Sequence, residues 1–159
     1  EVIDTVGVDA ARFFFLHKKA DSHLELDIDV ALKQSQENPV FYLQYAYVRT
    51  ISILRKAQEA GLEGSFEDSN WTEEEIALIK KSLELSQALT QIARQYATHL
   101  LANYALELAQ QFHVFYTSNR VVEPAHAATS ARRLALVSMV QKVLGLTLDM
   151  LGLSRRESM

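Results

Sequence analysis

The sequence contains no cysteine, and this absence excludes both a disulfide framework and a thiolate metal site. No apolar run approaches the ~20 residues that a membrane-spanning helix needs. The opening stretch, EVIDTVGVDAARFFF, is acidic and lacks the basic segment of a signal peptide. These absences favour a cytoplasmic protein that does not contact a membrane.

Proline and glycine are also scarce, with two prolines and five glycines in 159 residues. Few breaks combined with long stretches of 3.6-residue apolar periodicity predict an all-α fold. The length suits one domain, so we expect a single helical bundle of about five to six helices over residues 1–159. Because the first residue is not methionine and the chain opens inside a helical pattern, we expect it to be part of a longer protein.

The periodicity and the break points predict where the helices lie. A helix is expected over residues 8–18, followed by a short one near Asp29, although the alternation of Leu24, Leu26 and Ile28 also allows an extended stretch. Longer helices are expected over 38–61, 72–96, 98–119 and 125–153. The helix over 72–96 has Thr72 as its cap, and we expect its core face to include Ile76, Ile79, Leu83 and Ala93 or residues near it.

The segment ENPVFYLQYAYVRTISILRKAQEAG carries the clearest helix signals in the chain. Asn38 suits the N-cap, Pro39 the first helical position, and Gly61 the residue after the last turn. Its aromatic content is unusual, because buried tyrosine hydroxyls need hydrogen-bond partners. We therefore ask whether these rings belong to the core or to a binding surface.

Three polar side chains lie on one line of this helix. Tyr42, Tyr45 and Arg49 are spaced i, i+3 and i+7, which places them along one face. Tyr47 instead falls on the apolar stripe, and we assign it to packing. A line of two tyrosines and an arginine is suited to stacking against flat groups such as nucleobases.

Catalytic signatures are missing from the sequence. There is no phosphate-binding glycine loop and no nucleophile elbow. Glu123 and His126 have the spacing of a helical metal-ligand pair, but a di-metal site needs further ligands on other helices. Glu25, Asp27 and Asp29 alternate in LELDID and suit a solvated acidic edge better than a cation site. We predict no catalytic residue, no metal and no cofactor in this chain.

Several stretches together resemble the C-terminal anticodon-binding domain of arginyl-tRNA synthetases, the DALR type. The stretch from Gly7 to Phe13 is a variant of the Asp-Ala-Leu-Arg signature, and Ala-Asp-Ser-His follows at 20–23. An Asn-Pro-x-x-Tyr-x-Gln-Tyr-Ala-x-x-Arg pattern covers 38–49. The likeness continues in ANYALELAQQFHVFYTSNRVV, in ARRLALVSMVQKVLGLTLDMLGL and in the closing RESM, so it covers essentially the whole chain.

This resemblance implies an activity shared between two parts of a longer enzyme. The helical part would bind the anticodon loop of arginine tRNA, and not DNA. An upstream catalytic domain would use ATP and magnesium to attach arginine. The class I signatures near His-Ile-Gly-His and Lys-Met-Ser-Lys do not occur in these residues, so this chain alone is expected to be inactive.

The resemblance and the stacking argument together give six candidate anticodon contacts. Phe112 and Tyr116 are i, i+4 neighbours in QFHVFY, although Phe112 also suits a core position. Met159 matches the family's terminal methionine, but here it follows Arg-Glu-Ser instead of the more usual Pro-Glu-Arg. The full set is Tyr42, Tyr45, Arg49, Phe112, Tyr116 and Met159.

A helical protein–protein interaction module is the alternative. The net charge of −4 and the amphipathic last helix favour it over an RNA-binding domain. The surface around Tyr42, Tyr45 and Arg49 distinguishes the two. A basic, aromatic concavity would favour RNA, whereas a flat apolar stripe would favour a protein partner.

Overall fold

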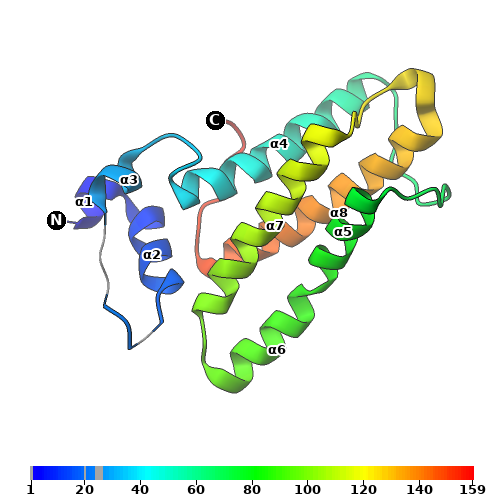
Figure 1. Ribbon diagram of the computed structural model, residues 1–159. Coiled ribbons are helices and arrows are strands. Elements are labelled where there is room, and N and C mark those ends of the chain that lie inside the picture. The colour runs from blue at the N-terminus through cyan, green and yellow to red at the C-terminus, as the bar shows by residue number, and fades with distance from the viewer. Residues whose placement is uncertain (1, 20, 24–26) are drawn as a thin grey trace.

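The computed structural model describes residues 2–19, 21–23 and 27–159, and every regular element in these ranges is a helix (Figure 1). The all-α prediction is therefore confirmed. In chain order the elements are α1 (Val2–Val6), α2 (Val8–His17), α3 (Ile28–Leu32), α4 (Pro39–Glu59), α5 (Glu73–Leu83), α6 (Leu85–Gln95), α7 (His99–Ser118), the short 3₁₀ helix η1 (Pro124–His126) and α8 (Ala127–Leu151).

There are somewhat more helices than the five to six expected, for two reasons. Helix α1 is only five residues long, too short for periodicity to reveal, whereas α3 confirms the short helix expected near Asp29. The single helix expected over 72–96 is divided between Leu83 and Leu85 into α5 and α6. The possible extended stretch at Leu24 and Leu26 lies outside the described residues.

The long helices form the bundle that carries the core. Helix α4 packs on α8, α5 packs on α7, and α7 also contacts α4 and α8. The small helices α1–α3 lie at one end, beside the start of α4, and α6 extends away from α5 along α7 (Figure 1). Helices α7 and α8 each bury a stripe of apolar side chains at helical spacing: Leu101, Leu108, Phe112, Phe115, Leu134, Val137, Leu144, Leu148 and Leu151.

The predicted ends of α4 are confirmed. The Asn38 side chain accepts hydrogen bonds from the backbone N–H groups of Val40 and Phe41, and Pro39 occupies the first turn. Asn38 also donates to the carbonyls of Ala31 and Lys33, which ties α3 to the start of α4. At the other end Gly61 has a φ of +67°, a conformation that favours glycine.

The capping box of Thr72 and Glu75 is confirmed, but the predicted core face of α5 and α6 is confirmed only in part, since Ile79 packs against the core. Ile76 and Leu83 are exposed, and so is Ala93. The buried positions are instead Glu75, Leu78, Ser82 and Leu85. The register shifts because the Glu75 carboxylate turns inward to meet two arginines of α8.

These arginines form a buried ionic cluster between α5 and α8. The Nε atoms of Arg132 and Arg133 lie 3.2 Å and 2.7 Å from Glu75 carboxylate oxygens. Arg132 also pairs with Asp68, and its guanidinium lies 5.4 Å from the centre of the Trp71 ring. Glu75 is 0% and Arg132 3% exposed, so each charge depends on the other for compensation.

Contrary to the expectation that no stretch is long and apolar enough to cross a membrane, α8 and the preceding η1 form one segment of 28 residues that is, by length and composition. Half of its most apolar window is buried inside the protein. Contacts with α4, α5 and α7 account for this burial. The segment therefore has the character of a core helix of the bundle.

Candidate nucleic-acid interface

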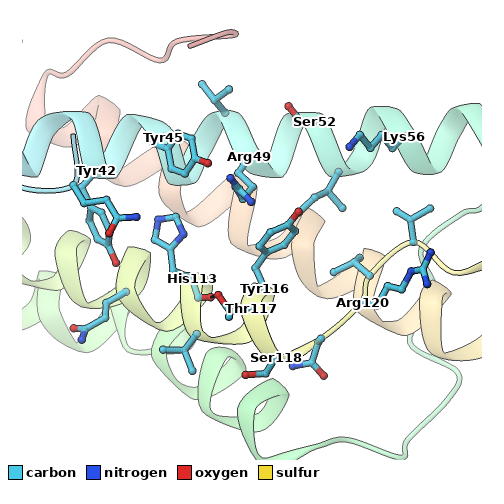
Figure 2. A pocket seen from close by; sticks show the side chains of 18 of the residues that line it. Tyr42, Tyr45, Arg49, Ser52, Lys56, His113, Tyr116, Thr117, Ser118 and Arg120 are labelled. Atoms are coloured by element: carbon cyan, nitrogen blue, oxygen red, sulfur yellow. Dashed lines mark hydrogen bonds between the residues drawn. The ribbon is translucent and has the colours of Figure 1, made fainter. Parts of the chain in front are cut away.

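An open groove of about 1490 Å³ runs between α4 and α7 (Figure 2). Helix α4 supplies one wall, α7 and the segment after it supply the other, and the last residue of the chain also lines it. We call it the α4–α7 groove. Its lining residues are Gln36, Tyr42, Tyr45, Val48, Arg49, Ser52, Ile53, Lys56, Gln110, His113, Val114, Tyr116, Thr117, Ser118, Asn119, Arg120, Val121, Val122 and Met159.

The line of Tyr42, Tyr45 and Arg49 faces this groove, as Figure 2 shows. The Tyr45 ring is stacked on that of Phe41, one turn earlier, at 6.2 Å between centroids and an angle of 7°. This stacking holds the Tyr45 ring in one orientation. Tyr42 is half-buried, and its burial raises the pKa of its hydroxyl, which therefore stays protonated and able to donate a hydrogen bond.

Arg49 lies between two tyrosine rings from different helices. Its guanidinium carbon is 4.7 Å from the centre of the Tyr45 ring and 4.5 Å from that of Tyr116 on α7. Both distances are within the ~6 Å range of cation–π attraction. The cation thus joins the two walls of the groove through flat faces, and a nucleobase is attracted to the same kind of face.

His113 is a groove residue that the sequence did not reveal. Its ring is 4.7 Å from Tyr42 and 5.8 Å from Tyr45, stacked at 20° on the latter. Burial, together with the nearby Arg49 cation, lowers the pKa of His113, so the ring is neutral at pH 7. Its Nε2 atom is buried and has no hydrogen-bond partner among the described residues.

The other three predicted contacts divide between groove and core. Tyr116 is half-buried and lines the groove, and Met159 lines it with 46% of its surface exposed. Phe112 is 0% exposed and packs beneath His113 and Tyr116, so it supports the groove from the core and presents no stacking face. Tyr47 packs on the far side of α4, with its ring against Gly145 of α8.

The groove is positively charged although the chain is acidic overall. Arg49, Lys56 and Arg120 line it, and none of its described lining residues is aspartate or glutamate. Arg120 is largely exposed and only loosely paired, at 3.9 Å from Glu123. The surface is therefore the basic, aromatic concavity that favours RNA over a protein partner.

The acidic candidates from the sequence do not meet at a metal site. In the ranges 2–19, 21–23 and 27–159, no three histidine, aspartate or glutamate side chains are grouped to hold an ion. His126 lies 3.3 Å from Glu123 as an exposed pair. Asp27 caps α3 by accepting from the Val30 N–H, whereas Glu25 lies outside the described residues.

Comparison with known proteins agrees with this geometry. The profile of the DALR anticodon binding domain matches residues 43–159. Arginine–tRNA ligase 1 of Halalkalibacterium halodurans is 39% identical over the whole chain, and arginine–tRNA ligase of Heliobacterium modesticaldum is 44% identical. The chain spans 29% and 30% of the lengths of these two relatives.

Solved structures are similar over nearly the whole chain. A putative arginyl-tRNA synthetase from Campylobacter jejuni superposes with a TM-score of 0.87 and 30% identity, over 99% of this chain and 35% of its own. The Thermus thermophilus arginyl-tRNA synthetase gives 0.81 and 31%, over 98% of this chain and 27% of its own.

Proposed function

Because the chain belongs to the DALR anticodon binding domain family of arginyl-tRNA synthetases, we propose that it binds the anticodon loop of arginine tRNA in the α4–α7 groove. The observation that carries this proposal is the guanidinium of Arg49 between Tyr45 and Tyr116. It marks a site where two helices each present an aromatic face to one planar group.

Anticodon bases suit this site because they are single-stranded and unstack readily. A base that leaves the loop can stack on an aromatic ring, for about 1–3 kcal/mol per base. Tyr42, Tyr45 and Tyr116 offer such rings at the groove, and Met159 offers a polarisable thioether. These four side chains belong to different helical turns or segments, so successive anticodon bases can each contact a different side chain.

Polar groups in the groove provide contacts that depend on base identity. The protonated Tyr42 hydroxyl donates, whereas a neutral His113 has one nitrogen that donates and one that accepts. The Nε2 of His113 is unpartnered and available once a base displaces its neighbours. Lys56 and Arg120 flank these groups and supply charge for the phosphates.

We propose that this chain is part of a longer enzyme whose two domains have different functions. This part binds tRNA, and an upstream catalytic domain in the same protein activates arginine with ATP and magnesium in the cytoplasm. The relatives that support this are roughly three times longer than the chain. A protein-interaction module is disfavoured, because the surface is hollow instead of flat and is lined by three cations but by no acidic side chain among the described residues.

Binding to RNA hairpins tests the proposal. We expect the 159-residue chain to bind a hairpin carrying an arginine anticodon more tightly than the same hairpin with altered anticodon bases, by fluorescence anisotropy at several salt concentrations. The preference should persist as salt rises, because stacking is less salt-dependent than phosphate contacts. Equal affinity for both hairpins at all salt concentrations would refute the proposal.

A further inference from the structure

The chain continues for eight residues beyond α8. The first residues of this C-terminal tail are hydrogen-bonded to α2, near the N-terminal end of the sequence. From the end of α8 this tail passes between α2 and the start of α4, as the red trace in Figure 1 shows. Leu153 is 4% exposed and joins the core. Leu153 therefore anchors the start of the tail in the core, and we call residues 152–155 the clamped segment.

Asp9 on α2 is the centre of the clamp. Its carboxylate accepts from the Ser154 N–H at 3.2 Å and from the Ser154 hydroxyl at 3.2 Å. The buried Gln44 amide of α4 donates both to Asp9, at 2.9 Å, and to the Ser154 carbonyl, at 3.1 Å. One carboxylate and one amide thus satisfy the N–H, carbonyl and hydroxyl groups of a single tail residue.

Arg12, one turn further along α2, holds the residue where the tail begins. Its guanidinium donates to the Gly152 carbonyl. Gly152 has a φ of +66°, and a Cβ placed there would lie 2.8 Å from a nitrogen of Arg12. The turn out of α8 is therefore fitted to glycine and to the arginine beside it.

The clamp lies close to the groove along the chain. Only three residues, 156–158, separate the clamped segment from Met159, which lines the groove. From Ser154 an extended chain reaches at most about 18 Å, but from the end of α8 it would reach about 28 Å. Fastening Ser154 therefore shrinks the volume available to Met159 and lowers the entropy lost when it meets RNA.

We propose that Asp9 is a positioning residue for anticodon binding, acting through Ser154 to hold Met159 at the groove. The inference rests on the proposed function. The stretch from Gly7 to Phe13 carries the resemblance to the family signature. In this proposal its role is to hold the C-terminal tail in place. Asp9 itself does not line the groove.

A spin label on the tail tests the clamp without RNA. The chain has no cysteine, so Ser158→Cys provides a single labelling site. In electron paramagnetic resonance spectra, Asp9→Asn should increase the mobility of the label. Asp29→Asn, which alters an exposed carboxylate on α3, is the matched control and should leave the spectrum unchanged. Unchanged mobility in Asp9→Asn would overturn the proposal.

Hairpin binding then tests the consequence for the groove. In the unlabelled chain, Asp9→Asn should weaken binding to the arginine-anticodon hairpin roughly three- to tenfold, measured well below the melting temperature. In a chain ending at Arg156 the same substitution should change affinity by less than about twofold, because the tail is gone. An equal loss in both chains would overturn the inference. If the native chain binds no hairpin, the proposed function fails, whereas the label still reports on the clamp.

Discussion

At the scale of single residues, Arg49 determines the character of the groove. Its guanidinium touches the faces of Tyr45 and Tyr116, and its charge contributes to the lowered pKa of His113. A lysine would supply the charge but not the flat surface. The planar cation therefore contacts two aromatic rings from different helices before any ligand arrives.

The tyrosines are the first test at this scale. Tyr42→Ala and Tyr45→Ala should each weaken hairpin binding by about 1–3 kcal/mol, because each removes a stacking face. Both rings are half-buried, so the loss of stability should be smaller than the ~3–5 kcal/mol typical of a fully buried aromatic. Tyr96→Ala, at an exposed tyrosine outside the groove, is the control. Losses of stability without any loss of affinity would assign Tyr42 and Tyr45 to the core.

Arg49 is expected to affect the salt dependence of binding. If its guanidinium reaches a phosphate when RNA binds, Arg49→Ala should weaken binding and make the slope of log K against log salt shallower by about 0.7. The measurement is a salt titration of hairpin affinity. Arg94→Ala, at an exposed cation on α6, should leave the slope unchanged. An unchanged slope in Arg49→Ala would mean that Arg49 acts by stacking alone.

His113 should make the stability of the domain depend on pH. Its pKa is lowered in the folded protein, so the unfolded chain takes up a proton first as the pH falls. Stability should therefore decrease below about pH 6.5, the ordinary pKa of histidine. His113→Gln removes this contribution, and its stability in urea should vary less between pH 7.5 and pH 5.5. His17, whose pKa is also lowered by burial, remains in both chains. Identical pH profiles of stability for the native chain and for His113→Gln would contradict the assignment of this pH dependence to His113.

At the scale of elements, one buried carboxylate fixes how α5 meets α8. Glu75 is both the capping-box residue of α5 and the partner of Arg132 and Arg133 on α8. The same interaction that starts the helix also sets its rotation about its axis. This explains why Ile76 and Leu83 face solvent although their spacing suits a core stripe.

Removing this carboxylate should therefore be costly. Glu75→Gln leaves two arginines with reduced compensation, one of them almost fully buried, and we expect a loss of about 3–5 kcal/mol in urea unfolding. Glu37→Gln, which alters an exposed pair with Lys33, should cost less than about 1 kcal/mol. Similar small losses for the two variants would show that the cluster contributes little to stability.

At the scale of the whole molecule, charge is distributed unevenly. The chain carries a net charge of −4, yet the groove has three cations and no acidic side chain among its described lining residues. Net charge therefore misrepresents the surface that RNA would meet. The acidic remainder lowers non-specific attraction to phosphate, so discrimination depends more on the groove.

The chain alone should not activate arginine. It carries neither of the class I signatures, so we expect no arginine-dependent exchange of pyrophosphate into ATP by the purified chain. The assay follows labelled pyrophosphate with and without arginine, with a complete arginine–tRNA ligase as the positive control. Exchange that copurifies with the chain and requires arginine would refute the division of work proposed above.

The sequence by itself determined the features that depend on neighbours along the chain. The caps at Asn38 and Thr72 and the glycine at Gly61 act within one turn. The line of Tyr42, Tyr45 and Arg49 follows from helical spacing alone. The core stripes of α7 and α8 follow from the same periodicity, because these helices are apolar over most of their length.

Only the tertiary structure decided the features that join distant residues. His113 enters the groove and Tyr116 meets Arg49 there because α7 packs beside α4, and Glu75 is buried because α8 presents two arginines to it. The clamp joins Asp9 to Ser154 across 145 positions. Such contacts depend on how helices pack and rotate against each other, and helical spacing within one segment carries no information about the side chains of another.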